Sequence, residues 1–188
     1  MSRIAEAIIR CVTRRPPDFL VGGQDNPYLK RWWVIPRNPL FNIYLHQFLR
    51  DDDDRALHDH PWPWCSIVLR GEYTEVTHPA CEVDSRDGFV NVTSSVHRDA
   101  LLTASYEHDR GDVLLIARRT FGAGSIRFHL PWFAHRLELT TDCPCWTLFI
   151  TGPRLREWGF HCPRGWVPWQ RFTAADDKGA IGPGCGEG

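Results

Sequence analysis

Two histidines separated by one residue, His58 and His60, are the residues of this chain whose types and spacing most directly suggest chemistry. On an extended strand alternate side chains point to the same face, so both imidazoles would point one way and Asp59 the other. Two imidazoles that converge from one side can bind a metal ion. They could equally be hydrogen-bonded histidines on a half-exposed strand. Residues elsewhere in the chain are needed to distinguish a metal site from this structural role.

Three further histidines in strand-like segments bear on a possible site. In AHRLEL, His135 shares a face with two leucines, which places it on the core side, where it needs a polar partner. In SIRFHL, the isoleucine, phenylalanine and leucine would take the apolar face, which leaves His129 on the other face and outside a ligand set. In NIYLHQF, His46 shares a face with Tyr44 and fits a core or supporting histidine.

The residues after the histidine pair read PWPWC. Trp62 and Trp64 continue the alternation of the histidines and should lean toward the same interior, either as walls of a ligand pocket or simply as a plug for the barrel. Pro61 and Pro63 lack backbone donors, so this stretch is predicted at a sheet edge or a strand entrance.

The elements that must position these residues are short β-like runs cut by turn residues, with no long helix between them. They are residues 41–50, 65–77, 101–108, 112–118, 125–130, 134–141 and 145–152. Such a series is typical of a β-sandwich or a closed barrel. The polar stretch 78–99 within it fits an elaborated hairpin or a long loop.

The ends of the chain differ from this middle part. A helix is predicted near the N-terminus, where Ile4, Ile8 and Val12 share one stripe before two prolines end it. We divide the chain into a helix and packing arm, a barrel, a tryptophan-rich irregular extension and a glycine-rich disordered tail. Their bounds are 1–40, 41–152, 153–175 and 176–188.

Composition limits the classes of function. With 188 residues, 43% of them hydrophobic, the chain can form one sizeable core. Its net charge is -1 and charges of both signs are mixed, so no surface for nucleic acid is indicated. The acidic run 51–54 reads as a solvated turn, although Asp54 could support the neighbouring histidines.

Seven cysteines, no evident signal peptide and no apolar run near the roughly 20 residues of a membrane span favour a reduced cytoplasm and no membrane partner. Cys143 and Cys145, in CPC, have the wrong spacing for a zinc knuckle or a thioredoxin motif. We interpret them as a turn that leads into a strand.

In these motifs the chain resembles the cupins, all-β proteins built as a double-stranded β-helix or jelly-roll barrel. HDHPWPWCSIVLRG corresponds to the first cupin box and GDVLLIARRTFGAGSIRFHLPWFAHRLEL to the second, so the resemblance covers about residues 41–152. It implies a divalent metal held by His58, His60 and His135. Trp64 or Cys65 stands where cupins place a glutamate ligand.

A three-histidine cupin site without the glutamate resembles the thiol dioxygenases, such as cysteine dioxygenase, which bind ferrous iron. Cys65 falls where some of those enzymes carry a cysteine cross-linked to a tyrosine, whereas Phe149 and Thr151 stand where that family shows its catalytic histidine and tyrosine. The candidate pocket residues are Trp62, Trp64, Cys65, His46, Tyr44 and Phe149.

The resemblance therefore implies a metal-dependent enzyme, first of all a mononuclear non-haem iron oxygenase acting on a small molecule. The metal would be Fe2+, with Mn2+, Ni2+ or Zn2+ as alternatives. The competing hypotheses are a non-redox metal cupin (an isomerase, epimerase or lyase) and a non-catalytic ligand-binding cupin. A homodimer is allowed. The arginines considered as anion anchors are Arg70, Arg118, Arg119, Arg136 and Arg154, none of which is assigned to a substrate.

Overall fold

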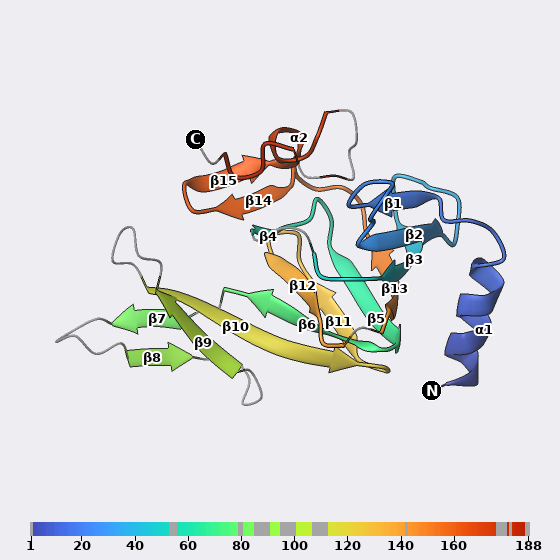
Figure 1. Ribbon diagram of the computed structural model, residues 1–188, viewed down its shortest axis with the longest axis horizontal. Helices are drawn as coiled ribbons and strands as arrows, with labels where there is room; N and C mark the ends of the chain where they lie inside the picture. The colour runs from blue at the N-terminus through green and yellow to red at the C-terminus, as the bar shows by residue number, and fades with distance from the viewer. Residues whose placement is uncertain are drawn as a thin grey trace.

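A computed structural model of the chain describes residues 2–52, 56–78, 81–84, 91–94, 101–106, 113–141, 143–175, 180 and 182–186. Its strands form two antiparallel sheets, of six and seven strands, and a separate two-stranded hairpin (Figure 1). Two helices, α1 (Arg3–Val12) and α2 (Trp169–Phe172), complete the described part. Within it, neither helix is long and apolar enough to cross a membrane.

The six-stranded sheet has the order β1-β2-β3-β13-β5-β11. At its centre, β13 pairs with β3 over seven residues, from Cys145 opposite Phe48 to Thr151 opposite Asn42. The bounds of its strands are β1 Phe19–Val21, β2 Leu29–Trp33, β3 Asn42–Phe48, β5 Trp64–Arg70, β11 Ile126–His129 and β13 Cys145–Thr151.

The seven-stranded sheet has the order β15-β14-β4-β12-β6-β10-β9. Its β4 has two residues and lies between β14 and β12, so two longer strands hold the segment that carries His58. The bounds of its strands are β4 Leu57–His58, β6 Glu72–Thr77, β9 Leu101–Tyr106, β10 Val113–Gly122, β12 His135–Leu139, β14 Gly159–Cys162 and β15 Gly165–Pro168.

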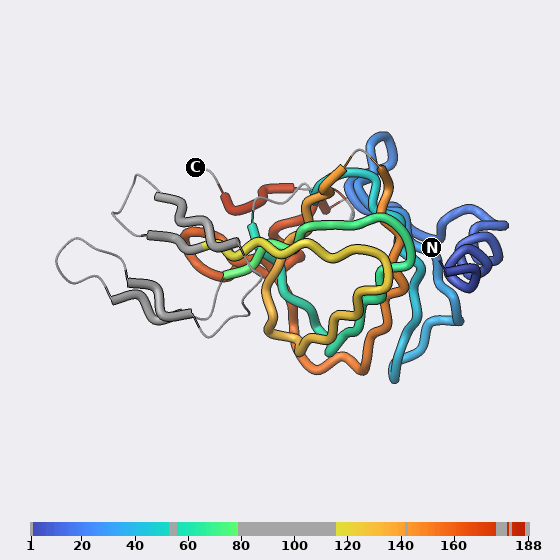
Figure 2. Tube along the Cα trace, turned by 90° about the horizontal axis from the view of Figure 1, so that it is seen from below, coloured from blue at the N-terminus to red at the C-terminus, as the bar shows by residue number. Residues whose placement is uncertain are grey.

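The core lies between the inner faces of the two sheets. Phe48 and Val68 from the six-stranded sheet pack with Tyr73 and Phe121 from the seven-stranded sheet, and all four are buried. Seen from below, the chain winds around this core as a closed ring (Figure 2). The prediction of an all-β jelly-roll barrel with a short N-terminal helix is confirmed.

The helix α1 covers the outer face of the six-stranded sheet. Ser2 caps the helix by accepting a hydrogen bond from the backbone N–H of Ile4 (3.3 Å). Ala5 and Ile9 face the sheet and are buried. They pack with side chains from four strands: Trp32, Leu45, Leu69 and Trp146. Because this face is covered, β13 is buried on both sides for much of its length.

Several strands lie outside the predicted barrel region of 41–152. From the arm, β1 and β2 join the six-stranded sheet, and from the extension, β14 and β15 join the seven-stranded sheet. Neither pair shows a long alternating pattern, which is why the sequence did not predict them. Within 78–99, β7 (Cys81–Asp84) and β8 (Asn91–Ser94) form a hairpin. The four-part division of the chain itself stays a prediction.

The orientation of β11 is the reverse of the one predicted. Ile126 and Phe128, expected on the core face, are each 67% exposed, whereas Arg127 and His129 face the interior. The physical reason is Glu75, a carboxylate buried on the opposite sheet, which ion-pairs with Arg127. Compensation of a buried charge outweighs the burial of two apolar side chains at a sheet edge.

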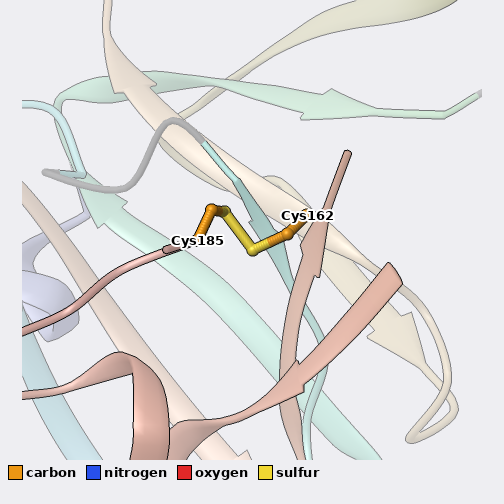
Figure 3. Close-up of a disulfide and its surroundings, with 2 residues drawn as sticks. All are labelled: Cys162 and Cys185. Carbon is orange, nitrogen blue, oxygen red and sulfur yellow. A yellow bond between two sulfur atoms is a disulfide. The ribbon is translucent and has the colours of Figure 1, made fainter. Parts of the chain in front are cut away.

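A disulfide that the sequence did not predict joins Cys162 of β14 to Cys185 (Figure 3). Near it, the backbone N–H groups of Gly182 and Gly184 donate to the carbonyl oxygen of Phe172 (3.0 and 3.2 Å). Residues 176–179, 181, 187 and 188 of the predicted tail lie outside the described residues. The cytoplasmic location stays a prediction, and this disulfide weighs against it, because reduced compartments rarely keep such bonds.

The turn between β5 and β6 yields a prediction about stability. Gly71 has φ +77°, and a Cβ there would lie 3.0 Å from the Cα of Cys145 and from the carbonyl oxygen of Pro144. We expect Gly71→Ala to lower the free energy of unfolding by about 1–2 kcal/mol for the positive φ, and by roughly 1 kcal/mol more for the overlap. Urea denaturation measures both.

The matched control is Gly124→Ala, because Gly124 also has a positive φ (+94°) but a Cβ would meet no atom within 4 Å. In Gly124→Ala the free energy of unfolding should fall only by the part that comes from the positive φ. Equal destabilisation of the two variants would show that the close approach of β13 to the turn carries no energetic weight.

Candidate metal centre

Three histidines converge at one end of the barrel. His135, the first residue of β12, lies directly opposite His58 of β4, and His60 follows two residues later. The Nε2 atoms of His60 and His135 are 2.9 Å apart. One ring nitrogen from each of the three histidines lies within 4.8 Å of the other two, close enough for a single ion to contact all of them. The convergence that strand alternation predicted is thus present.

The backbone explains why the two neighbouring histidines point the same way although β4 ends at His58. The N–H of Asp59 donates to the carbonyl oxygen of Gly159 in β14, and the N–H of His60 donates to that of Pro131 on the other side (both 3.0 Å). Successive backbone N–H groups that donate to opposite sides are typical of an extended strand. It directs His58 and His60 into the barrel and Asp59 away from it.

Asp59 points into the C-terminal extension, where it is 1% exposed. Its carboxylate accepts hydrogen bonds from the backbone N–H of Gly159 (2.9 Å), from Arg156 (2.9 Å) and from Trp166 Nε1 (3.1 Å), and lies 3.2 Å from His161 Nε2. Burial alone would raise the pKa of Asp59, but these partners hold the pKa below its usual value. The extension is therefore fastened to the residue between two candidate ligands.

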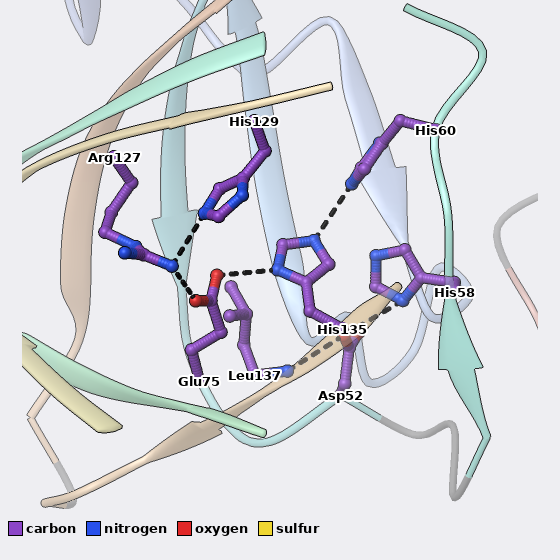
Figure 4. Close-up of polar contacts among 8 residues, drawn as sticks. All are labelled: Asp52, His58, His60, Glu75, Arg127, His129, His135 and Leu137. Atoms are coloured by element: carbon purple, nitrogen blue, oxygen red, sulfur yellow. Dashed lines mark hydrogen bonds and ion pairs between the residues drawn. The ribbon is translucent and has the colours of Figure 1, made fainter. Parts of the chain in front are cut away.

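A buried carboxylate supports His135 from behind (Figure 4). Glu75 Oε1 lies 2.8 Å from His135 Nδ1, and the other oxygen accepts a hydrogen bond from Arg127. Burial raises the pKa of Glu75, and the adjacent Arg127 charge opposes that rise. Because Nδ1 of His135 donates to the carboxylate, its Nε2 keeps a lone pair that points at the cluster.

His58 has a looser supporting contact. Its Nδ1 lies 3.7 Å from Asp52 Oδ2, which is longer than a direct hydrogen bond, while the other ring nitrogen faces the cluster (Figure 4). Asp52 also accepts a hydrogen bond from the backbone N–H of Leu137 (3.4 Å), which ties it to β12. The sequence suggested such a role for Asp54, which lies outside the described residues.

The protonation of the cluster suits a metal ion. Burial lowers the pKa of both His60 and His135 well below the usual value, and the charges of neighbouring histidines and arginines lower it further. Neutral imidazoles with free lone pairs are the form that binds divalent transition metals. The residues therefore fit a divalent metal ion, whose identity the donor set leaves open among iron, manganese, nickel and zinc.

The three histidines line a cavity of about 90 Å³. Predicted pocket residues line it: Tyr44, His46, Trp62, Trp64 and Phe149. Cys65 is the exception, because it alternates with Trp64 and Ser66, which line the cavity, and therefore points to the opposite face of β5. The predicted place of Cys65 in the pocket is thus corrected, and the comparison with a cross-linked cysteine no longer applies.

His129 lies beside the cluster but does not join it. Its ring stacks on Phe133 (3.5 Å between ring centroids), and its Nε2 lies 2.6 Å from an Arg127 Nη. Burial lowers the pKa of His129 to about 4, so the imidazole is neutral near pH 7. The expectation that His129 lies outside the ligand set agrees with this position, although the strand faces the other way.

Four residues important to the site were missed in the sequence: Arg31, Asp52, Glu75 and Arg127. For Glu75 a signal existed, because the run YTEVT places this glutamate on the same face as Tyr73, an aromatic core candidate. For Arg127 the alternating apolar residues of β11 gave the opposite signal. Arg31, next to two tryptophans, had no distinguishing pattern.

Neither a family model nor a curated protein matches the chain. Among solved structures, Bacillus subtilis oxalate decarboxylase, a protein with Mn(II) centres, aligns with a TM-score of 0.44 and 13% identity over 79% of this chain and 30% of its own. An RmlC-like cupin protein from Ralstonia eutropha JMP134 aligns with a TM-score of 0.43 and 9% identity, covering 81% of this chain and 74% of its own.

A third neighbour is an uncharacterized conserved protein with a double-stranded β-helix domain from Klebsiella pneumoniae. Its TM-score is 0.42 at 14% identity, over 74% of this chain and 89% of its own. The second neighbour is described as a cupin protein and the third as a protein with a double-stranded β-helix domain. This chain spans 30% of the decarboxylase, and similarity at this level says nothing about its own metal or reaction.

The contact between Glu75 and His135 leads to a prediction about metal affinity. We expect Glu75→Gln to weaken binding of Mn2+ or Co2+ by about 10–100-fold, because the carboxylate fixes the orientation and tautomer of the imidazole. Competition titration against a chelator measures the affinity, at a temperature where circular dichroism shows the variant folded. Glu72→Gln, on the same strand, is the control. Unchanged affinity in Glu75→Gln would disprove the supporting role.

The contacts of Asp59 predict that stability depends on the extension. Replacing Asp59 by Asn removes the charge that Arg156 and Trp166 contact, and we expect it to lower the free energy of unfolding by at least about 2 kcal/mol. Urea denaturation followed by tryptophan fluorescence measures the loss. Asp25→Asn, at an exposed position, should change little. A loss no larger than that of the control would contradict this account.

Proposed function

We propose that this chain is a metal-dependent cupin enzyme, a mononuclear non-haem iron oxygenase that acts on a small molecule through His58, His60 and His135. The observation that carries the proposal is the convergence of three imidazoles, with 2.9 Å between the Nε2 atoms of His60 and His135. Three protein ligands are the number typical of catalytic sites, which keep a position open, whereas structural sites are closed by four.

The surroundings of the cluster support a reactive site. The ring of Trp64 stacks on His135 (5.0 Å between centroids), and the ring of Phe149 lies 5.8 Å from that of His60. These rings limit the access of water to the imidazoles. A ferrous ion bound there would supply redox and Lewis-acid chemistry, while the protein holds the ligands and the substrate in place.

One imidazole of the cavity wall, His46, is poorly placed to take a proton from a substrate. An isomerase, epimerase or lyase needs a side chain that can take a proton from the substrate. His46 is the one described imidazole of the wall outside the cluster, and its Nε2 already accepts a hydrogen bond from Arg31 Nε (2.9 Å). Burial, followed by the charge of Arg31, also lowers the pKa of His46 well below its usual value.

Metal content after anaerobic reconstitution tests the site itself. Wild-type protein is expected to bind about one equivalent of Fe2+, and His60→Ala and His135→Ala are expected to bind less than about a tenth of an equivalent. His78→Ala, at an exposed histidine, is the control and should bind as wild type does. Retention of metal by the His60 and His135 variants would refute the three-histidine site.

Oxygen uptake tests the reaction. Iron-loaded wild type should consume oxygen with a substrate from a panel of small molecules, and His135→Ala should not. Metal binding combined with substrate turnover that needs no oxygen would replace the oxygenase by a non-redox cupin enzyme. Ligand binding without turnover of any kind would make the chain a binding protein.

A further inference from the structure

We propose that the disulfide between Cys162 and Cys185 is a redox switch. Thiol exchange at Cys185 releases the C-terminal tail, loosens the segment that carries His58 and His60, and lowers the metal affinity of the cluster. The effect on the metal rests on the proposed function. The inference adds to it a site of covalent modification and a form of regulation outside the cavity.

The disulfide fastens the tail to the seven-stranded sheet. Cys162 is the last residue of β14, and Cys185 follows 23 residues later (Figure 3). Residues 182–186 read GPGCG, so apart from one proline Cys185 supplies the only side chain that can hold this stretch. A disulfide that closes a loop of this length suppresses its opening on the order of 100-fold. Release of the tail therefore depends mainly on this one bond.

The disulfide belongs to an apolar cluster that includes the start of β4. Cys162 is buried together with Ala56, Phe160 and Phe172, and Cys185 packs against them. Ala56 lies two residues before His58, in the chain segment that leads to the candidate ligands. Loss of the disulfide thus removes packing from the residues next to the metal centre.

Phe160 connects this cluster to the histidines. It lies directly opposite His58 in the pairing of β14 with β4, and the two rings are 6.0 Å apart between centroids. On its other side it stacks on Phe172 of α2 (3.6 Å), whose carbonyl oxygen accepts the hydrogen bonds of the tail. Because β4 has only two residues, disorder in β14 reaches His58 directly.

The two sulfur atoms differ in accessibility, which decides where exchange begins. Cys162 is 9% exposed, whereas Cys185 is only half-buried. A glutathione thiolate attacks Cys185 Sγ, the S–S bond breaks, and the Cys162 sulfur leaves as a thiolate that takes a proton from water. A second glutathione thiolate attacks the glutathione sulfur of the mixed disulfide, which frees the Cys185 thiol and forms glutathione disulfide. The reverse sequence, with glutathione disulfide as the oxidant, closes the bond.

Glutathione trapping tests the site of exchange. Oxidised protein is incubated with glutathione, quenched with acid and digested, and the peptides are analysed by mass spectrometry. The glutathione adduct is expected on the peptide that contains Cys185. An adduct confined to Cys162 would contradict the order of steps that the accessibility of the two sulfurs implies.

Hydrogen exchange measures the order of the segment with no metal present. Oxidised wild type, wild type reduced with a phosphine, and Cys185→Ser are compared in peptides that cover residues 56–62. Reduction and substitution should each raise the exchange rate at least about tenfold. Cys11→Ser/Cys143→Ser, which removes two exposed free thiols, is the control and should exchange as oxidised wild type does. Equal rates in oxidised and reduced protein would overturn the proposal.

Metal affinity tests the link to the histidines. Co2+ is titrated against a chelator after anaerobic removal of the reductant. Reduced wild type and Cys185→Ser should bind Co2+ at least about fivefold more weakly than oxidised wild type. Because free thiols can themselves bind Co2+, Cys162→Ala/Cys185→Ala is titrated as well and should show the same weakening. If this double variant fails to fold, Cys185→Ser decides.

The switch and the metal site can fail separately. Faster exchange of residues 56–62 on reduction, in a protein that takes up no metal, would uphold the switch and refute the metal site. One equivalent of metal bound with the same affinity in oxidised and reduced protein would refute the switch alone.

Discussion

The pairing of β4 with its two neighbours is the constraint on which the site depends. A two-residue strand holds His58 opposite His135 on one side and Phe160 on the other, and the extended backbone continues through Asp59 to His60. Such a short strand has too few hydrogen bonds to be stable alone. The convergence of the histidines is thus a property of the seven-stranded sheet as a whole, in which the partners of β4 lie about 75 and 100 residues further along the chain.

Buried charges organise the interior around this strand. Glu75 and Arg127 bridge the two sheets, and Asp59 and Arg156 join the barrel to the extension. Glu75 contacts the candidate ligand His135, and Asp59 stands between the candidate ligands His58 and His60 in the chain. In each pair the arginine compensates the charge of the carboxylate. Arg31 departs from this arrangement, because its described partners, His46 and Tyr44, are both uncharged. Asp52, the third buried acidic side chain of the described residues, contacts His58 and the backbone N–H of Leu137.

Strand alternation was enough to predict the barrel, the direction of His58 and His60, the inward position of His135 and five further residues of the cavity wall. It failed where a polar interaction outweighed apolar burial, as in β11, where the ion pair of Arg127 reverses the strand. It also could not find Glu75 or Arg31, because which strands face each other is set by long-range pairing and not by local pattern. The two-residue β4 and the disulfide at Cys162 have no periodic signal at all.

The four contacts of Asp59 show that the site depends on the C-terminal extension as well as on the barrel. The resemblance to cupins ends near residue 152, yet among the described residues the donors to this carboxylate are Arg156, Gly159, His161 and Trp166. A protein shortened to the barrel would keep all three histidines and still lose the partners of the buried charge between two of them. The extension therefore supports the segment between two candidate ligands, and the resemblance of the barrel to cupins alone is a poor guide to where this protein can be cut.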